Sequence, residues 1–157
     1  MISYVDSEVK IFHPLCEDAL NQALKNLSLN SEYEVLHHQY TGTLEMDYVV
    51  RNRRTKKYLC VIEVKRTPAD VQSTRYQVQA QSYVQMNSPE NEKPFYILTN
   101  LEKLISFRYD TTKPRVYQQM LLPGLENVCD FSADDENSIV NKLALVFQRL
   151  LDDFINN

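Results

Sequence analysis

Residues 47–71 read DYVVRNRRTKKYLCVIEVKRTPADV, and this stretch decides the fold of the 157-residue chain. Two apolar runs flank the polar segment RNRRTKK, a pattern that predicts two strands joined as an antiparallel hairpin. Side chains alternate between the two faces of a strand, so Glu63 and Lys65 project from the same face. If the hairpin closes around RNRRTKK, Asp47 comes level with them. Two carboxylates and an amine are therefore expected at the end of a buried strand, where charges need compensation.

This group of charges predicts a metal site. Two carboxylate oxygens, with water and a substrate phosphate, suit Mg²⁺, and a lysine beside the ion could orient a water for attack on phosphorus. An isolated E-x-K tripeptide is more often a plain ion pair. Asp47, the hairpin and the helix that follows it favour the metal site over that simpler interpretation.

The remaining sequence predicts an α/β domain with the element order αβββαβ and further elements after it. Pro14 suits the first turn of a helix, and Gly42 marks a turn. In chain order, the pattern predicts a helix from His13 with an apolar stripe to Leu27, strands at 33–40, 46–50 and 57–65, a helix from Thr67 to about Gln85, strands at 95–99, 104–109 and 116–120, and an amphipathic helix at 135–155. We expect that last helix to pack on the mixed sheet rather than to form an interface.

A polar and aromatic stripe follows the predicted helix that begins at Thr67. Its members recur at intervals of four, three and four residues, and they are Gln72, Tyr76, Gln79 and Tyr83. Glutamine and tyrosine can donate to phosphate oxygens, although such a stripe can also simply face solvent. The core side of this helix is expected to carry Val71, Val78 and Val84.

Composition excludes several classes of function. The apolar fraction of 43% and the charged fraction of 24% are those of a globular chain, and the length suits a single domain over residues 1–157. The two glycines, Gly42 and Gly124, are too far apart for a phosphate-binding GxxxxGK[ST] loop or a GxGxxG dinucleotide turn. The chain therefore has no ATP motor of that type.

The net charge of −4 disfavours non-specific binding of nucleic acid, yet the charges are unevenly distributed. A basic cluster lies at the predicted hairpin tip and could face phosphates or simply be solvated; its members are Arg51, Arg53, Arg54, Lys56 and Lys57. Three cysteines without CxxC spacing argue against a disulfide framework and a zinc knuckle. With no membrane-spanning run or signal peptide, the sequence predicts a cytoplasmic protein that does not bind membranes.

Histidine is rare, with three residues in the chain. His37 and His38 are consecutive in a predicted strand, so they are expected to point to opposite faces and not to bind one metal ion together.

The D-x(15)-E-V-K spacing resembles the motif of the PD-(D/E)XK nuclease superfamily. Residues 79–83 are similar to the QxxxY motif of several of its branches. Residues 94–110, PFYILTNLEKLISFRYD, resemble the strand–turn–strand element in the nuclease region of type I restriction enzyme R subunits. The resemblance covers about residues 8–120, and it implies a restriction-endonuclease-like fold and hydrolysis of DNA phosphodiesters with Mg²⁺, or Mn²⁺ in its place.

The resemblance also implies roles for individual residues. Asp47, Glu63 and the carbonyl of Val64 would hold the metal, and Lys65 would position or activate the water. An acid of the first helix often joins such sites, and Glu17 fits that place better than Glu8. The stripe residues Gln79 and Tyr83 would contact DNA or support the site, and the basic hairpin tip would help to hold DNA.

The chain departs from the family pattern in two respects. Met46 stands where the superfamily motif has proline, and the large translocase of type I R subunits is absent. A homodimer or other subunits of a restriction–modification complex are compatible partners, because cutting both strands of a duplex usually takes two sites. The alternative function is a non-catalytic module with a nuclease-like fold that binds DNA or a partner within a larger defence complex.

Overall fold

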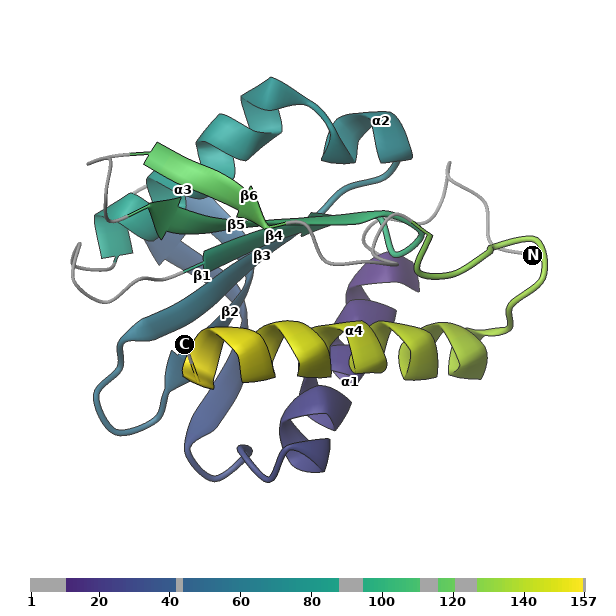
Figure 1. Cartoon of the computed structure of the whole chain (residues 1–157), viewed down its shortest axis with the longest axis horizontal. Helices are drawn as coiled ribbons and strands as arrows, with labels where there is room; N and C mark the ends of the chain where they lie inside the picture. The colour runs from purple at the N-terminus through teal and green to yellow at the C-terminus, as the bar shows by residue number, and fades with distance from the viewer. Residues whose placement is uncertain (1–10, 42–43, 88–94, 111–115, 121–126, 157) are drawn as a thin grey trace.

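The chain folds around one six-stranded β-sheet in the order β1-β2-β3-β4-β5-β6, with helices on both faces (Figure 1). The computed structural model describes residues 11–41, 44–87, 95–110, 116–120 and 127–156. The described elements are α1 (His13–Asn26), β1 (Tyr33–Thr41), β2 (Leu44–Asn52), β3 (Tyr58–Val64), α2 (Pro68–Val71), α3 (Thr74–Asn87), β4 (Phe95–Thr99), β5 (Leu104–Asp110), β6 (Val116–Met120) and α4 (Glu136–Asn156). The predicted mixed α/β architecture with a C-terminal helix is confirmed.

The hairpin of β2 and β3 forms as the sequence predicts. The two strands are antiparallel and pair Tyr48 with Ile62, so Asp47 comes opposite Glu63. The register shifts by one residue between Val50 and Arg51, which adds twist near the hairpin tip. The chain then crosses over through α2 and α3 to β4, and β3–β4 is the parallel pair among the described strands.

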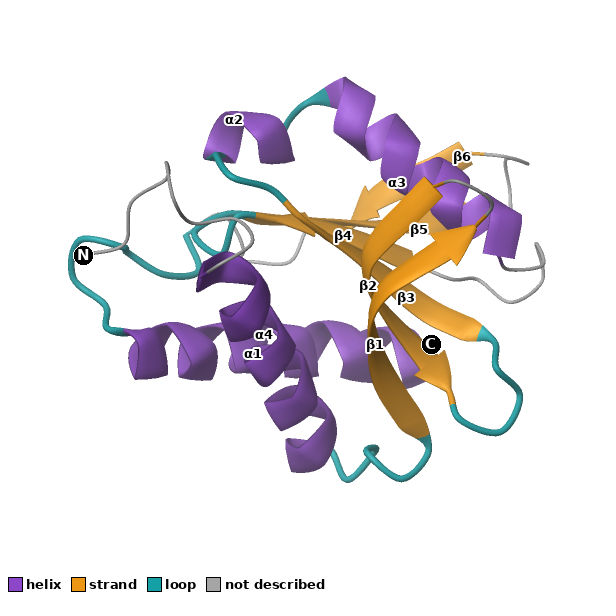
Figure 2. Ribbon diagram, turned by 180° about the vertical axis from the view of Figure 1, so that it is seen from behind, coloured by secondary structure: helices purple, strands orange, loops and turns teal. Residues whose placement is uncertain are grey.

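The sheet buries a different set of side chains on each face. The face that carries Ile62 and Val64 packs against α1 and α4, and the opposite face, which carries Val61, packs against α2 and α3. Figure 2 shows these two helical layers on either side of the strands. Because Glu63 alternates with Ile62 and Val64, its side chain lies on the α3 face.

The helix expected from Thr67 to about Gln85 is interrupted. The Thr67 hydroxyl accepts from the Asp70 N–H and caps α2, which ends at Val71, and α3 begins only at Thr74. Gln72 is the C-cap residue of α2 and is not on α3, so the expected stripe of four residues on one helix is wrong at its first member. The short polar segment at Gln72 and Ser73 turns the chain before α3 crosses the sheet.

The valine side of the same helix is also corrected. Val71 is buried as expected, but the Val78 side chain is 59% exposed. Tyr83 and Ala80 take the core positions of α3 instead. The larger buried area of a tyrosine explains this orientation, because the helix gains more by burying the ring than by burying the valine.

The C-terminal helix packs as expected. Ile139, Leu143 and Leu150 are buried in the same core as the apolar stripe of α1, and Phe147 joins them. Within the described residues, no helix is long and apolar enough to cross a membrane. Several predictions lie outside the described residues: the turn at Gly42, Glu8 as the helix acid, and the side chain of Val84.

Candidate active site

Asp47 on β2 and Glu63 on β3 bring two carboxyl groups together on the α3 face of the sheet. The Asp47 Oδ2 atom accepts a hydrogen bond of 2.8 Å from the backbone N–H of Val64, which fixes it beside the end of β3. Asp47 also lies close enough to Glu63 for its charge to raise the pKa of that carboxyl. The geometry therefore places both carboxylates beside Val64, whose carbonyl the sequence resemblance adds to the metal ligands.

Glu63 is buried, and its Oε1 atom has no hydrogen-bond partner among the described residues. Burial raises the pKa of Glu63 well above its ordinary value of 4.5, and the nearby Asp47 raises it further. Lys65 acts in the opposite direction and lowers that pKa. An unpartnered, buried carboxylate oxygen beside a second carboxylate is a position that a cation would stabilise.

Lys65 directly follows β3 and lies on the same side as Glu63. Its backbone N–H donates to the Thr99 carbonyl at 2.8 Å, which ties it to the end of β4. Its Nζ atom lies 4.1 Å from the centre of the Tyr76 ring, a cation–π contact that holds the amine over α3. The Thr99 hydroxyl in turn donates to the Lys103 carbonyl at 2.6 Å and closes the turn after β4.

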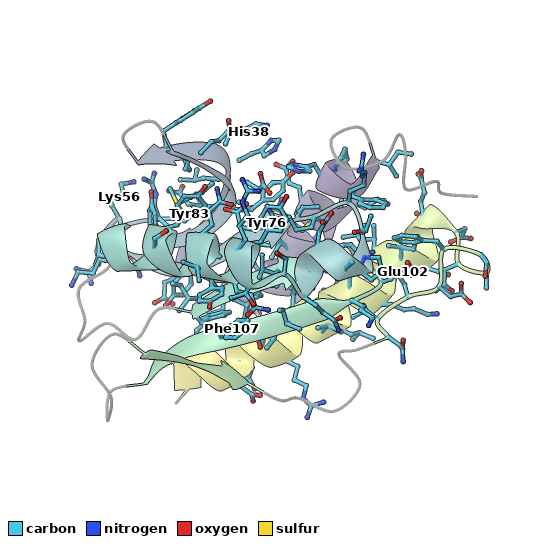
Figure 3. The ribbon with its side chains drawn as sticks, turned by 90° about the horizontal axis from the view of Figure 1, so that it is seen from above. His38, Lys56, Tyr76, Tyr83, Glu102 and Phe107 are labelled. Atoms are coloured by element: carbon cyan, nitrogen blue, oxygen red, sulfur yellow. The ribbon has the colours of Figure 1, made fainter. Side chains whose placement is uncertain are left out.

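Helix α3 carries Tyr76 and Tyr83, which are labelled in Figure 3. Tyr83 is buried, and its side chain shares a hydrogen bond with Gln79. Burial raises the pKa of Tyr83, and the charges of Glu63 and Asp47 raise it too, so its hydroxyl is within electrostatic reach of the carboxyl pair. Tyr83 therefore lies near the carboxyl pair, and the expected role of Gln79 and Tyr83 in binding DNA or supporting the site stays a prediction.

The first helix brings His13, a residue that the sequence analysis does not assign to the site. Its Nε2 atom is 4.0 Å from Asp47 Oδ2. The Tyr48 hydroxyl donates to the His13 carbonyl at 2.9 Å and anchors the start of α1 on β2. Glu17 lies one turn further along α1, and none of the described contacts joins it to Asp47 or Glu63. The one feature of the sequence that could have suggested His13 is its spacing of four residues from Glu17, which puts both on the same side of the helix.

His37 and His38 correct an expectation. The pairing of β1 with β2 is interrupted at His38, whose φ is +54°, and this left-handed backbone turns its ring onto the ring of His37. The two ring centres are 3.6 Å apart, so the rings share one face and do not point to opposite faces. Burial lowers the pKa of His37, and it lowers the pKa of His13 as well.

The basic hairpin tip lies at the far end of β3. From Lys57 to Glu63 the strand extends by six residues, which is roughly 20 Å. Arg51 and Arg53 bind Glu34 of β1, at 2.8 and 3.3 Å. The structure therefore separates the basic cluster from the carboxylates, and its role in DNA binding stays a prediction.

Comparisons with known proteins agree on one relationship. Residues 2–153 match the family described as the BpuSI N-terminal domain. A solved structure of the type IIG restriction endonuclease BpuSI is similar to this chain, with a TM-score of 0.86 and 46% sequence identity. The similarity covers 99% of this chain and 18% of that chain, so this chain spans less than a fifth of its relative. No curated protein sequence matches the chain.

Proposed function

The chain belongs to the family of the BpuSI N-terminal domain, and from that premise we propose that it is a metal-dependent nuclease domain that hydrolyses DNA phosphodiester bonds. The observation that carries the proposal is the pair of carboxyl groups of the buried Glu63 and the partly buried Asp47, with Lys65 beside it. The restriction endonuclease named in the comparison and the resemblance to PD-(D/E)XK nucleases support the same assignment.

The residues present fit a hard divalent cation. Glu63 Oε1 is a buried oxygen without a partner among the described residues, and Asp47 offers a second carboxylate next to it. Both donors are oxygens, which Mg²⁺ prefers, and Mn²⁺ accepts the same ligands. In the proposed site, Asp47, Glu63 and the Val64 carbonyl hold the metal.

The metal would neutralise the phosphate and lower the pKa of a bound water. The residues of the chain perform the other tasks. Asp47 is held in place by the Val64 N–H, so one ligand is already oriented before DNA binds. Lys65, steadied over Tyr76, donates to the attacking water or to a phosphate oxygen. Tyr83 and Ala80, buried in the same core as Val61 and Val49 of the sheet, hold α3 over this face.

The proposed roles of Lys65 as a donor and of Asp47 as a metal ligand both predict a large loss of activity when either residue is replaced. We expect Asp47→Asn and Lys65→Met each to slow the cleavage of supercoiled plasmid in Mg²⁺ by about 10²-fold or more. Two variants serve as controls, Glu32→Gln and Lys25→Met, because both side chains are exposed and no described contact joins either of them to Asp47 or Glu63. These controls should cleave at the wild-type rate.

Cleavage that is unchanged in Asp47→Asn would contradict the assignment of the site. The alternative function, a non-catalytic binding module, predicts another outcome. In that case, a wild-type chain would bind DNA without cutting it in Mg²⁺ or Mn²⁺, whether alone or with the other parts of its restriction system.

A further inference from the structure

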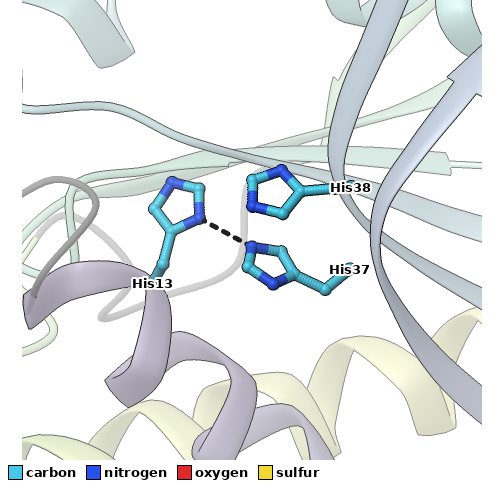
Figure 4. A group of neighbouring side chains, drawn as sticks. All are labelled: His13, His37 and His38. Carbon is cyan, nitrogen blue, oxygen red and sulfur yellow. Dashed lines mark hydrogen bonds between the residues drawn. The ribbon is translucent and has the colours of Figure 1, made fainter.

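All three histidines of the chain meet at one place, although 24 residues separate His13 from His37. One ring nitrogen from each of His13, His37 and His38 lies within 4.8 Å of the others (Figure 4). The His13 Nδ1 and His37 Nε2 atoms are 3.2 Å apart. Two nitrogens bound to one tetrahedral Zn²⁺ ion are about 3.3 Å apart, so this spacing already matches a metal site.

A hydrogen bond between His13 and His37 explains that one distance, but it does not explain His38. The left-handed region is unfavourable for a residue with a Cβ atom, and His38 occupies it with a φ of +54°. This backbone turns the His38 ring onto the side of the sheet where His37 and His13 lie. The ring is 44% exposed, so it has room to rotate and an ion can reach it from solvent.

In two of the three histidines, the ring nitrogen that points away from the cluster faces a carboxylate. The Nε2 atom of His13 faces Asp47, which leaves Nδ1 directed at His37. The Nδ1 atom of His38 contacts Glu45, which leaves Nε2 as the nitrogen that can face the cluster. Histidines that bind metals commonly direct their second ring nitrogen at a carboxylate, which fixes the tautomer and strengthens the ligand.

We propose that His13, His37 and His38 form a binding site for a nitrogen-preferring divalent transition ion of the Zn²⁺ class, a second ion beside the one expected at the carboxyl pair. Three imidazoles leave the fourth position of a tetrahedral ion for water. The oxygen-rich pair of Asp47 and Glu63 selects a hard ion, whereas three neutral nitrogens select a softer one. The ion would join the start of α1 to β1.

The test is calorimetric titration of Zn²⁺ into the untagged chain, with an excess of Mg²⁺ present to occupy the carboxylates. We expect a single Zn²⁺ ion to bind per chain. His38→Asn removes one ligand, and asparagine tolerates the left-handed backbone, so the variant should fold. Its affinity for Zn²⁺ should fall by about tenfold or more, judging from the losses that even outer-shell changes cause.

Glu63→Gln is the matched control, because it removes a carboxylate and leaves the three histidines intact. It should bind Zn²⁺ as tightly as the wild type. Binding that is lost in Glu63→Gln but kept in His38→Asn would overturn the proposal, and so would a wild type that binds no Zn²⁺. Nitrogen NMR of the imidazole rings gives a second readout, since the signals of all three rings should shift with Zn²⁺. The assay contains no DNA, so its outcome is independent of the proposed nuclease function.

Discussion

Glu63 is the residue whose environment departs furthest from that of an ordinary glutamate. Its carboxyl group is buried, faces Asp47, and has one oxygen without a partner among the described residues. Such an arrangement costs stability in the metal-free protein, because the charged form is poorly solvated. Natural proteins keep unfavourable positions of this kind mainly at sites that act on a ligand.

The raised pKa of Glu63 gives a prediction on stability. The folded protein binds this proton more tightly than the unfolded chain, so stability falls as pH rises from the ordinary 4.5 through the raised pKa. Glu63→Gln removes that dependence. Without metal, we expect the variant to be more stable than the wild type near neutral pH, by about 1–3 kcal/mol.

Urea unfolding in the presence of a metal chelator measures the difference in unfolding free energy between Glu63→Gln and the wild type across the pH range. This difference should vanish as pH falls to the ordinary pKa of 4.5 and below, where Glu63 is protonated in both the folded and the unfolded protein. Added Mg²⁺ should also reduce it, because the ion stabilises the charged pair. The opposite result, in which the metal-free wild type becomes more stable than Glu63→Gln as pH rises, would contradict a buried Glu63 with a raised pKa. Glu32→Gln should show neither effect, since Glu32 is exposed.

Among the elements, α3 determines how the site is covered. Its buried side carries Ala80 and Tyr83, and Tyr76 lies under the Lys65 amine. The helix starts at Thr74, after the interruption that separates it from α2, and this break sets its direction across β3 and β4. A single continuous helix from Thr67 would present a different side to the sheet.

Two substitutions on α3 test which side is buried. Tyr83→Ala should lower the free energy of unfolding by roughly 3–5 kcal/mol, as expected for an aromatic side chain removed from a core. Val78→Lys should change it by less than about 0.5 kcal/mol, because Val78 is mostly exposed. Thermal or urea unfolding distinguishes the two, and a larger loss in Val78→Lys would mean that α3 is rotated.

The sequence predicts the elements that local patterns control. Apolar alternation locates β2 and β3, and the spacing from Asp47 to Glu63 follows from the hairpin register. The break at Gln72 and the left-handed backbone of His38 do not follow from apolar alternation, because a helix end and a positive φ at one residue leave no such pattern. His13 is missed for another reason, because only the packing of α1 on β2 brings it to Asp47.

At the scale of the whole molecule, the two faces of the sheet differ in character. The face under α1 and α4 is an apolar core, and the face under α3 carries the charged groups at the end of β3. The chain has a net charge of −4 and spans 18% of the BpuSI restriction endonuclease chain. If the chain acts on DNA as proposed, its net negative charge predicts that this domain alone binds DNA weakly, since phosphate contacts need positive charge.

The most direct test of the nuclease assignment is the position of a bound metal ion. Crystals grown with Mn²⁺ should give an anomalous scattering peak in contact with the Asp47 and Glu63 carboxylates and the Val64 carbonyl. Glu63 Oε1 should then have a partner. Ordered carboxylates with no peak between them, or a Mn²⁺ ion bound only at the three histidines, would contradict the account.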